Sequence, residues 1–169
     1  NMQRMSKDQM DAWRAFYAPR DKKFHEAKLT GKELVRWKFQ RYAKNYLRSV
    51  RGVDDSVGTL QKALKELGIE DNTIVIYSSD QGFYIGDHGW YDKRWMYEES
   101  LKMPFIIKWP GVVKAGSRST QMIQNLDYAE TFLDIAGAPI PENMQGRSLL
   151  PILKKGKAED WRKSIYYHY

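Results

Sequence analysis

The sequence predicts an α/β fold with a mostly parallel central sheet flanked by helices. Two short runs, TIVIY at 73–77 and PFIIKW at 104–109, are apolar without alternation, which is typical of strands buried on both faces of a parallel sheet. Before the first run, apolar residues recur at steps of three and four, which predicts a helix packed on one face of that sheet. Helical and strand patterns that alternate along a chain indicate the α/β class.

The first half of the chain is predicted to be mainly one long helix. Residues 1–29 indicate an irregular or loosely helical lead-in with a turn around Pro19. The TGKE pattern at 30–33 is a capping box, which starts a helix over 31–67. Gly68 ends this helix, since glycine readily adopts the left-handed conformation that closes helices. The apolar stripe of the helix consists of Tyr46, Val50, Val53, Val57, Leu60, Leu64 and Leu67.

The second half is predicted to combine strands, a short helix and loops. The two apolar runs are expected to be neighbouring strands. Asp127 and Glu130 form a second capping box, with Asp127 as the N-cap of a short helix that Gly137 closes. Residues 138–146 indicate a loop, and IYYHY at 165–169 resembles a further strand.

Length, composition and charge limit the possible classes of protein. A chain of 169 residues without cysteine fits one domain or part of a larger one, and it contains no disulfide or zinc thiolate site. No apolar run of about eighteen residues predicts a membrane span, and the polar start lacks a signal-peptide core. The net charge of +7 favours an anionic partner, such as a phosphate or a sulfated glycan. Because acidic residues are interspersed in the basic stretches, we expect solvated helix faces and no nucleic-acid partner.

A candidate site follows the first predicted strand. In open α/β sheets, ligands bind just beyond the carboxyl ends of the strands, and this is where Asp80 and Gln81 lie. A carboxylate beside an amide oxygen suits calcium or magnesium rather than zinc. The loop that follows is able to turn back and bring His88 and Lys93 to the same pocket, where lysine would face an anion and histidine would move a proton. The glycines that permit this turn are Gly82, Gly86 and Gly89.

Structural interpretations of the same residues remain open. An aspartate after a strand, such as Asp80, is commonly a cap in a turn. His88 is also explained as a hydrogen-bonded structural histidine, and Lys93 as an ion pair with Asp92 or Glu98.

The pattern as a whole resembles the sulfatases of the alkaline-phosphatase-like superfamily. The resemblance is carried by SDQGFYIGDHGWYDKRWMYEESLKMPFIIKWPG at 79–111 and NLDYAETFLDIAGAPIPENMQGRSLLPIL at 125–153. RYAKNYLRSVRGVDDSVGTLQKAL at 41–64 looks like the helix that precedes this strand in the family. The best-matched region is 30–153, and the sequence looks closest to glycan sulfatases of the N-acetylglucosamine-6-sulfatase, heparan-sulfatase and iduronate-sulfatase types.

The resemblance implies a portion of an alkaline-phosphatase-like sandwich and a set of site residues. Asp80 and Gln81 match calcium ligands of the family, Lys93 matches a lysine that contacts the sulfate, and His88 matches a pocket histidine that is a candidate proton donor. The residues that would meet the sugar are Arg94, Trp90 and Tyr91.

The implied function is the hydrolysis of sulfate esters on sulfated glycans, in a periplasmic, extracellular or lysosomal protein. The family's formylglycine nucleophile arises within a (C/S)-x-P-x-R motif, and no such motif occurs here. We therefore interpret residues 1–169 as a single partial domain, the later part of a catalytic domain, with 154–169 as the start of a continuation. Alone, this chain should be inactive and should self-associate through exposed sheet edges. The alternatives are a phosphoryl or phosphonate ester hydrolase of the same superfamily and a non-catalytic protein that binds sulfated glycans.

Overall fold

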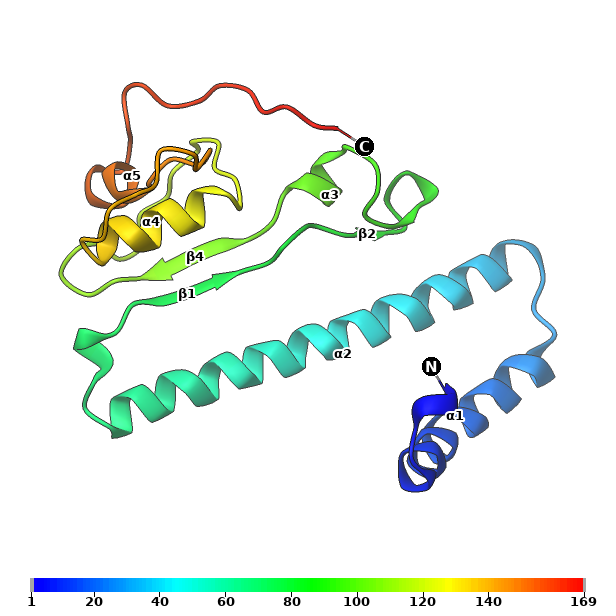
Figure 1. Cartoon of the computed structure of the whole chain (residues 1–169). Helices are drawn as coiled ribbons and strands as arrows, with labels where there is room; N and C mark the ends of the chain where they lie inside the picture. Colours follow the sequence, from blue (N-terminus) through cyan, green and yellow to red (C-terminus); the bar gives the residue numbers. More distant parts are fainter. Residues whose placement is uncertain (1, 169) are drawn as a thin grey trace. The chain divides into compact units, whose positions relative to one another are not determined.

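The computed structural model describes residues 2–168, which form two compact parts, one ending at Gly52 and one beginning at Val53 (Figure 1). No helix among these residues has the length and apolar character needed to cross a membrane. In chain order the elements are η1 (Met2–Arg4), α1 (Lys7–Ala27), α2 (Gly31–Glu66), η2 (Glu70–Asn72), β1 (Val75–Ser78), β2 (Tyr84–Ile85), η3 (Asp87–Gly89), β3 (Tyr91–Asp92), α3 (Glu98–Leu101), β4 (Phe105–Lys108), α4 (Asp127–Ile135) and α5 (Leu150–Lys155).

Helix α1 occupies most of the segment predicted to be irregular or loosely helical, so the helical alternative is correct and the turn predicted around Pro19 is wrong. Ser6 caps the helix: its hydroxyl accepts from the Gln9 amide at 3.3 Å, and the Gln9 side chain accepts from the Ser6 amide at 2.9 Å. Pro19 lies inside the helix and not at a turn. Proline removes one amide donor and its ring crowds the carbonyl four residues earlier, but α1 continues through Pro19 to Ala27.

Aromatic and charged contacts join α1 to the start of α2. The rings of Phe24 and Trp37 stack with their centroids 4.2 Å apart. Arg41 donates to the Asp21 carboxylate at 2.7 Å and also lies over the Trp37 ring. These contacts pack the start of α2 against α1.

The predicted end of α2 is confirmed. The helix spans Gly31–Glu66, and Gly68 follows it with a φ of +67°. The Gly68 amide donates to the Lys65 carbonyl and the Ile69 amide to the Leu64 carbonyl, both at 3.1 Å. This pair of bonds is the Schellman motif that a left-handed glycine permits.

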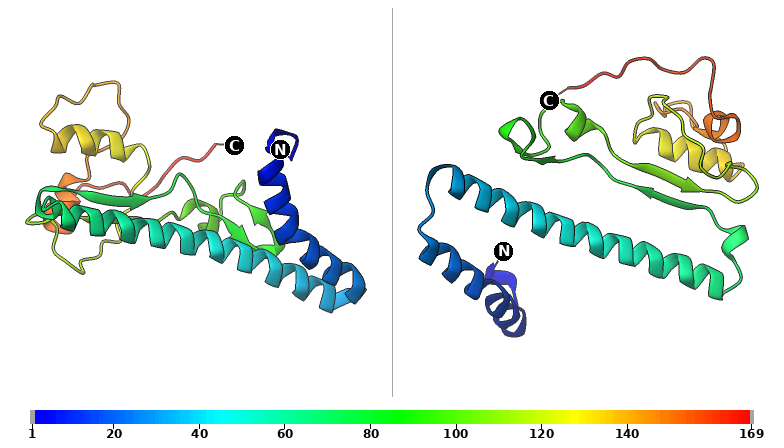
Figure 2. Two further views of the ribbon diagram at one scale, coloured as in Figure 1. Left: turned by 90° about the horizontal axis from the view of Figure 1, so that it is seen from below. Right: turned by 180° about the vertical axis from the view of Figure 1, so that it is seen from behind.

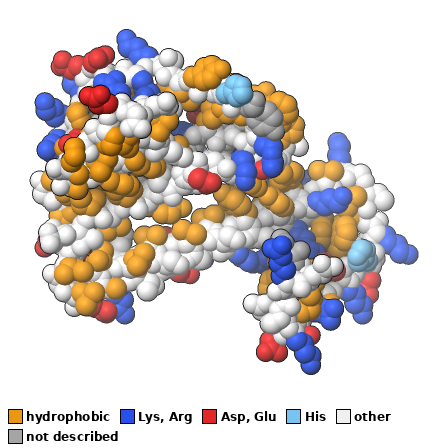
Figure 3. Space-filling view, in the orientation of Figure 1, with side chains coloured by type: hydrophobic (Ala, Val, Ile, Leu, Met, Phe, Trp, Pro, Cys, Tyr) orange, Lys and Arg blue, Asp and Glu red, His pale blue; other side chains and the backbone are white. Residues whose placement is uncertain are grey.

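The prediction that the apolar stripe of α2 covers the sheet is wrong for the described structure. No residue of α2 is buried, and Figure 3 shows hydrophobic side chains open at its surface. The exposed fractions are 46% for Val50, 44% for Val53, 63% for Leu60 and 70% for Leu67. The periodicity identified the helix correctly, but its apolar face is only partly covered, with Tyr46, Val57 and Leu64 half-buried.

The two predicted strands are neighbours, as expected, but they are antiparallel. β1 and β4 pair in a register from Val75 opposite Lys108 to Ser78 opposite Phe105, and Figure 2 shows them side by side in both views. A parallel pair needs a connection that crosses to the other end of the sheet. Here the connection at 79–104 contains only the short β2–β3 hairpin and α3, and it returns to the end at which β1 finishes.

The strand pair is covered on one face only, so the predicted burial of both faces is also wrong. The face with Ser78 and Phe105 contacts α4, where the Tyr128 ring lies 5.3 Å from that of Phe105. On the opposite face Tyr77 and Ile106 lie across from each other, 38% and 63% exposed. A short apolar run therefore did not distinguish a doubly buried strand from a singly buried one.

The segment from α4 onward contains the main buried cluster of Leu149, Ile152 and Trp161. Helix α5, which the sequence did not predict, supplies Ile152, and α4 ends as predicted at Gly137, whose φ is +66°. Residues 138–146 contain no helix or strand, as expected for a loop.

Two predictions near α4 and the end of the chain need correction. Asp127 is the first residue of α4 and not its N-cap, and its carboxylate accepts from the Gln124 amide at 2.8 Å. Glu130 accepts from the Gly146 amide instead of completing a capping box. Residues 165–168 form no strand, because no described strand lies beside them, and residue 169 lies outside the described range.

Candidate functional site

Asp80 and Gln81 follow the end of β1, as predicted, and no basic side chain of the described residues pairs with their oxygen atoms. Asp80 is exposed, and its carboxylate lies 3.3 Å from the Ser79 hydroxyl. Within residues 2–168, the Gln81 side-chain amide makes no hydrogen bond. This chemistry fits a hard divalent cation. The described residues contain no cluster of three or more acidic, histidine or cysteine side chains arranged to hold a metal, so the pair forms only part of such a site.

The peptide between these two residues is held by neighbouring side chains. Asn125 donates to the Asp80 carbonyl at 2.7 Å, and the Gln81 amide donates to the Ser79 hydroxyl at 3.5 Å. The end of β1 is tied to α4 as well, because Ser78 and Tyr128 share a hydroxyl bond of 2.8 Å. The loop before α4 and α4 itself therefore fix the position of the candidate metal pair.

Gly82 is required by close packing, and not by a positive φ. Its amide donates to the Ser100 carbonyl at 2.7 Å. A Cβ atom at this position would lie 2.1 Å from the carbonyl oxygen of Glu99. The segment after Asp80 can therefore approach α3 only because residue 82 has no side chain.

The loop between β2 and β3 turns back on itself, as predicted, through left-handed backbone. Gly86 and Gly89 have φ angles of +101° and +79°, and His88 itself has a φ of +56°. The Gly86 amide closes the turn by donating to the Trp90 carbonyl at 2.8 Å. Asp92, with a φ of +89°, is a further unusual residue directly before Lys93. Such conformations cost free energy and tend to gather at functional sites.

His88 and Lys93 both have the contacts that their structural interpretations required. His88 Nε2 lies 3.3 Å from Glu99 Oε2, and the ring stacks on Tyr97 with centroids 4.6 Å apart. Lys93 Nζ lies 3.9 Å from Asp92 Oδ1, so Asp92, one of the two predicted partners, is present. The convergence of these two side chains on Asp80 stays a prediction.

Helix α3 connects the two halves of the candidate site. Ser100 is only 7% exposed. Its carbonyl accepts a hydrogen bond from the Gly82 amide, and its hydroxyl donates one to the Lys93 carbonyl. The neighbouring Glu99 contacts His88. Sequence reasoning missed both α3 residues, since a serine and a glutamate within a charged run carry no signal of such contacts.

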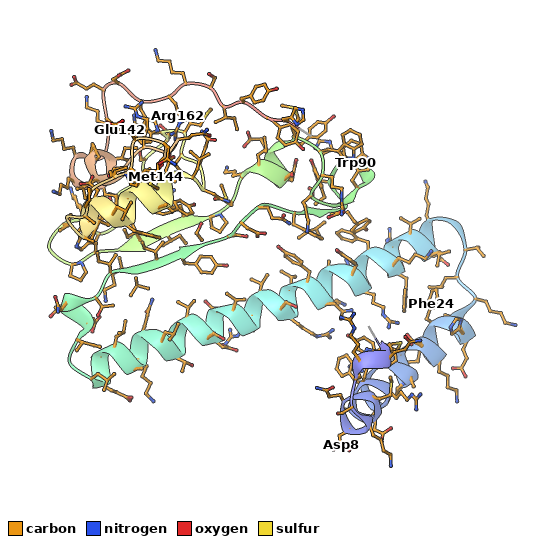
Figure 4. All side chains as sticks on the ribbon, viewed as in Figure 1. Asp8, Phe24, Trp90, Glu142, Met144 and Arg162 are labelled. Atoms are coloured by element: carbon orange, nitrogen blue, oxygen red, sulfur yellow. The ribbon has the colours of Figure 1, made fainter. Side chains whose placement is uncertain are left out.

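Aromatic side chains surround the proposed sugar-contacting residues. Trp90 lies 5.5 Å from Trp95 in a stacked arrangement and 5.9 Å from Tyr84 edge-on, at the hairpin labelled in Figure 4. Tyr84 is fully buried, which raises the pKa of its phenol, and it donates to the Trp95 carbonyl at 2.7 Å. Tyr91 is 45% exposed, and Arg94 pairs with Asp92.

Comparisons with known proteins identify the relatives of this chain. The family model described as N-sulphoglucosamine sulphohydrolase, C-terminal, matches residues 86–169. The N-acetylglucosamine-6-O-sulfatase of Bacteroides thetaiotaomicron is 48% identical over 168 residues, which is 98% of this chain and 30% of that protein. A structure solved in complex with its substrate D-glucosamine-2-N,6-O-disulfate is 46% identical with a TM-score of 0.89, and the match covers 99% of this chain and 34% of that one.

A second structure represents a different activity. The phosphonate monoester hydrolase of Agrobacterium radiobacter is 32% identical with a TM-score of 0.61, over 65% of this chain and 22% of that one. The chain thus spans about a third or less of the length of these relatives.

Proposed function

This chain belongs to the sulfatase family, and from that premise we propose that its protein hydrolyses sulfate esters on sulfated glycans. The observation that carries the proposal is the similarity, over 99% of the chain, to a structure solved with a disulfated glucosamine as substrate. We favour glucosamine sulfated at O6 as the substrate class, because the sulfatase that is 48% identical has that specificity in its name.

Calcium is the proposed metal, and Asp80 and Gln81 are its proposed ligands. Both offer oxygen, and neither is bonded to a basic side chain within the described range. Bound calcium would supply positive charge that neutralises sulfate oxygens. Because calcium takes about six to eight oxygen ligands, most of the ligand set must come from residues other than these two.

Lys93 and His88 are the proposed charge-stabilising and proton-donating groups. Lys93 is half exposed and its contact with Asp92 is long, at 3.9 Å, so the ammonium can move to a sulfate. When the bond from sulfur to the sugar oxygen breaks, the leaving oxygen needs a proton. His88, whose ring contacts Glu99 at 3.3 Å, is the proposed donor. The nucleophile is proposed to be a formylglycine outside residues 1–169, since no residue of the chain fits its motif.

A polyanionic substrate fits the distribution of charge. Residues 1–52 contain fourteen Lys and Arg against five Asp and Glu, a formal net charge of +9, whereas the whole chain carries +7. The α1–α2 part therefore holds all of the excess positive charge, which attracts sulfated polymers. The proposed sugar contacts are Arg94, Trp90 and Tyr91. As part of the same proposal, the protein works in a periplasmic, extracellular or lysosomal compartment.

Two other functions have specific support. Structural similarity to a phosphonate monoester hydrolase favours a related ester hydrolase. The basic first part favours a non-catalytic protein that binds sulfated glycans.

One experiment separates these functions. The full-length gene product, with its nucleophile matured, is assayed for sulfate release from 6-sulfated glucosamine and for hydrolysis of a phosphonate monoester. We expect sulfate release, and Asp80→Ala and Lys93→Ala should each lose most of the rate, whereas the exposed Lys102→Ala should retain it. Undiminished release from both site variants would show that the site is wrongly placed. Faster phosphonate hydrolysis would favour the related hydrolase, and glycan binding without turnover would favour the binding protein.

A further inference from the structure

One peptide group joins the two proposed metal ligands, and side chains hold both of its ends. Its carbonyl, on Asp80, accepts from Asn125 Nδ2 at 2.7 Å across 45 positions of sequence. Its amide, on Gln81, lies 3.5 Å from the Ser79 hydroxyl. The orientation of this peptide plane sets ψ of Asp80 and φ of Gln81 together. A hydrogen bond to it therefore constrains the backbone from which both oxygen-bearing side chains project.

Asn125 makes this bond from a well-anchored position. Its own carbonyl accepts from the Tyr128 amide at 3.1 Å, which places Asn125 in the turn that leads into α4. Tyr128 in turn shares a hydrogen bond with Ser78 at the end of β1. Asp127, two positions after Asn125, is fully buried. The amide side chain is suited to the task because a carbonyl oxygen needs a donor, which a carboxylate of the same shape cannot supply.

We propose that Asn125 is a positioning residue for the Asp80–Gln81 pair, and that it presets this pair for a divalent cation. The inference rests on the proposed function, in which the pair holds calcium. Asn125 does not touch the cation, and it acts through the peptide alone. Side chains that orient metal ligands typically contribute tenfold to a hundredfold in metal affinity. Because Asn125 orients the ligands through their backbone, we expect its loss to weaken calcium binding about tenfold.

The test measures calcium affinity in the full-length protein by titration calorimetry, together with the melting temperature without metal. Asn125→Ala removes the donor, and Asn125→Asp removes it while keeping the shape. Gln121→Ala is the matched control, since Gln121 lies in the same segment before α4 and also donates an amide hydrogen to a backbone carbonyl, but to that of Ala158, at 2.7 Å. We expect both Asn125 variants to bind calcium about tenfold more weakly, whereas Gln121→Ala lowers the melting temperature and keeps the affinity.

The outcomes separate this inference from the proposed function. If Asp80→Ala abolishes calcium binding and both Asn125 variants bind as tightly as the wild type, the metal pair stands and the role of Asn125 is overturned. An equal loss of affinity in Gln121→Ala would also overturn it, because the effect would then be one of general stability. If the wild type binds no calcium that depends on Asp80, both the metal pair and the role of Asn125 fail.

Discussion

Arg162 is expected to be the most important single residue for the stability of the part that begins at Val53. The carboxylate of Asp127 is fully buried, and the side chain of Arg162, 13% exposed, forms an ion pair with it through both terminal nitrogens. Two backbone amides complete its hydrogen bonds, those of Gln124 at 2.8 Å and Arg147 at 2.9 Å. Figure 4 shows Arg162 beside α4. Arg162→Met would leave this buried charge without its cationic partner.

The expected loss follows from the groups that remain. Removing one partner of a buried ion pair typically costs about 3–5 kcal/mol. The two backbone amides still solvate the Asp127 carboxylate in the variant, so we place Arg162→Met at the lower end, about 3 kcal/mol in the free energy of unfolding. For a folding unit of roughly 150–250 residues this corresponds to a fall of about 6–12 °C in melting temperature.

Urea denaturation of the full-length protein, with thermal melting as a second measurement, checks this value. Lys163→Met is the control, since it removes an exposed charge one position along the same segment and should change stability little. Adding Asp127→Asn to Arg162→Met should recover part of the loss, because the buried charge is then gone. A free energy within about 1 kcal/mol of the wild type for Arg162→Met would refute the reasoning, since it would lie well below the range for a broken buried pair.

The remaining predictions concern the site loop, pH and the isolated chain. Gly82→Ala should reduce activity strongly in the sulfate-release assay, because its Cβ would meet the Glu99 carbonyl at 2.1 Å and displace the segment after Asp80; full activity would contradict this packing. The hydrogen bond and charge of Lys108 hold the pKa of Glu70 below its ordinary value. This contact should therefore stabilise the protein at any pH above the ordinary pKa of glutamate, and the stabilisation should be lost as the pH falls through the lowered pKa. Lys108→Gln should therefore reduce stability at neutral pH but not in acid, and an equal effect at both would contradict the pairing. Residues 1–169 produced alone should self-associate in light scattering and release no sulfate, and a monodisperse, active monomer would be evidence against both expectations.

The sequence predicted those helix ends that depend only on residues adjacent in the chain. The ends at Gly68 and Gly137 were predictable because a helix end of this kind needs only a glycine with a positive φ after the last turn. The turn predicted at Pro19 is wrong because the helix-forming residues on both sides of this proline outweigh its effect. Strand direction was beyond local reasoning, since the direction of β4 depends on the path of 79–104, and the same apolar run suits either orientation.

The candidate site was predictable only as far as it lies directly after a strand. Asp80 and Gln81 were proposed as site residues because ligands bind at strand ends. Asn125 and Ser100 were not found, because their roles are contacts to backbone groups 45 and 7 positions away, and no spacing rule marks such contacts. His88 shows a further limit. Its contact with Glu99 is expected of a structural histidine and equally of a proton donor, so the contact does not distinguish the two interpretations.

The open face of the strand pair and the incomplete metal site point to the same missing neighbour. Tyr77 and Ile106, 38% and 63% exposed, leave part of an apolar surface on β1 and β4 open to solvent, and Tyr77 lies only three positions before Asp80. Burial of this apolar surface is favourable, and any segment that covers it must pass beside the end of β1. The same segment would then reach the Asp80–Gln81 pair, which supplies too few oxygens for calcium by itself. We therefore expect the remaining metal ligands to lie on the element that packs over Tyr77, so that covering the sheet and completing the metal site occur in one folding step.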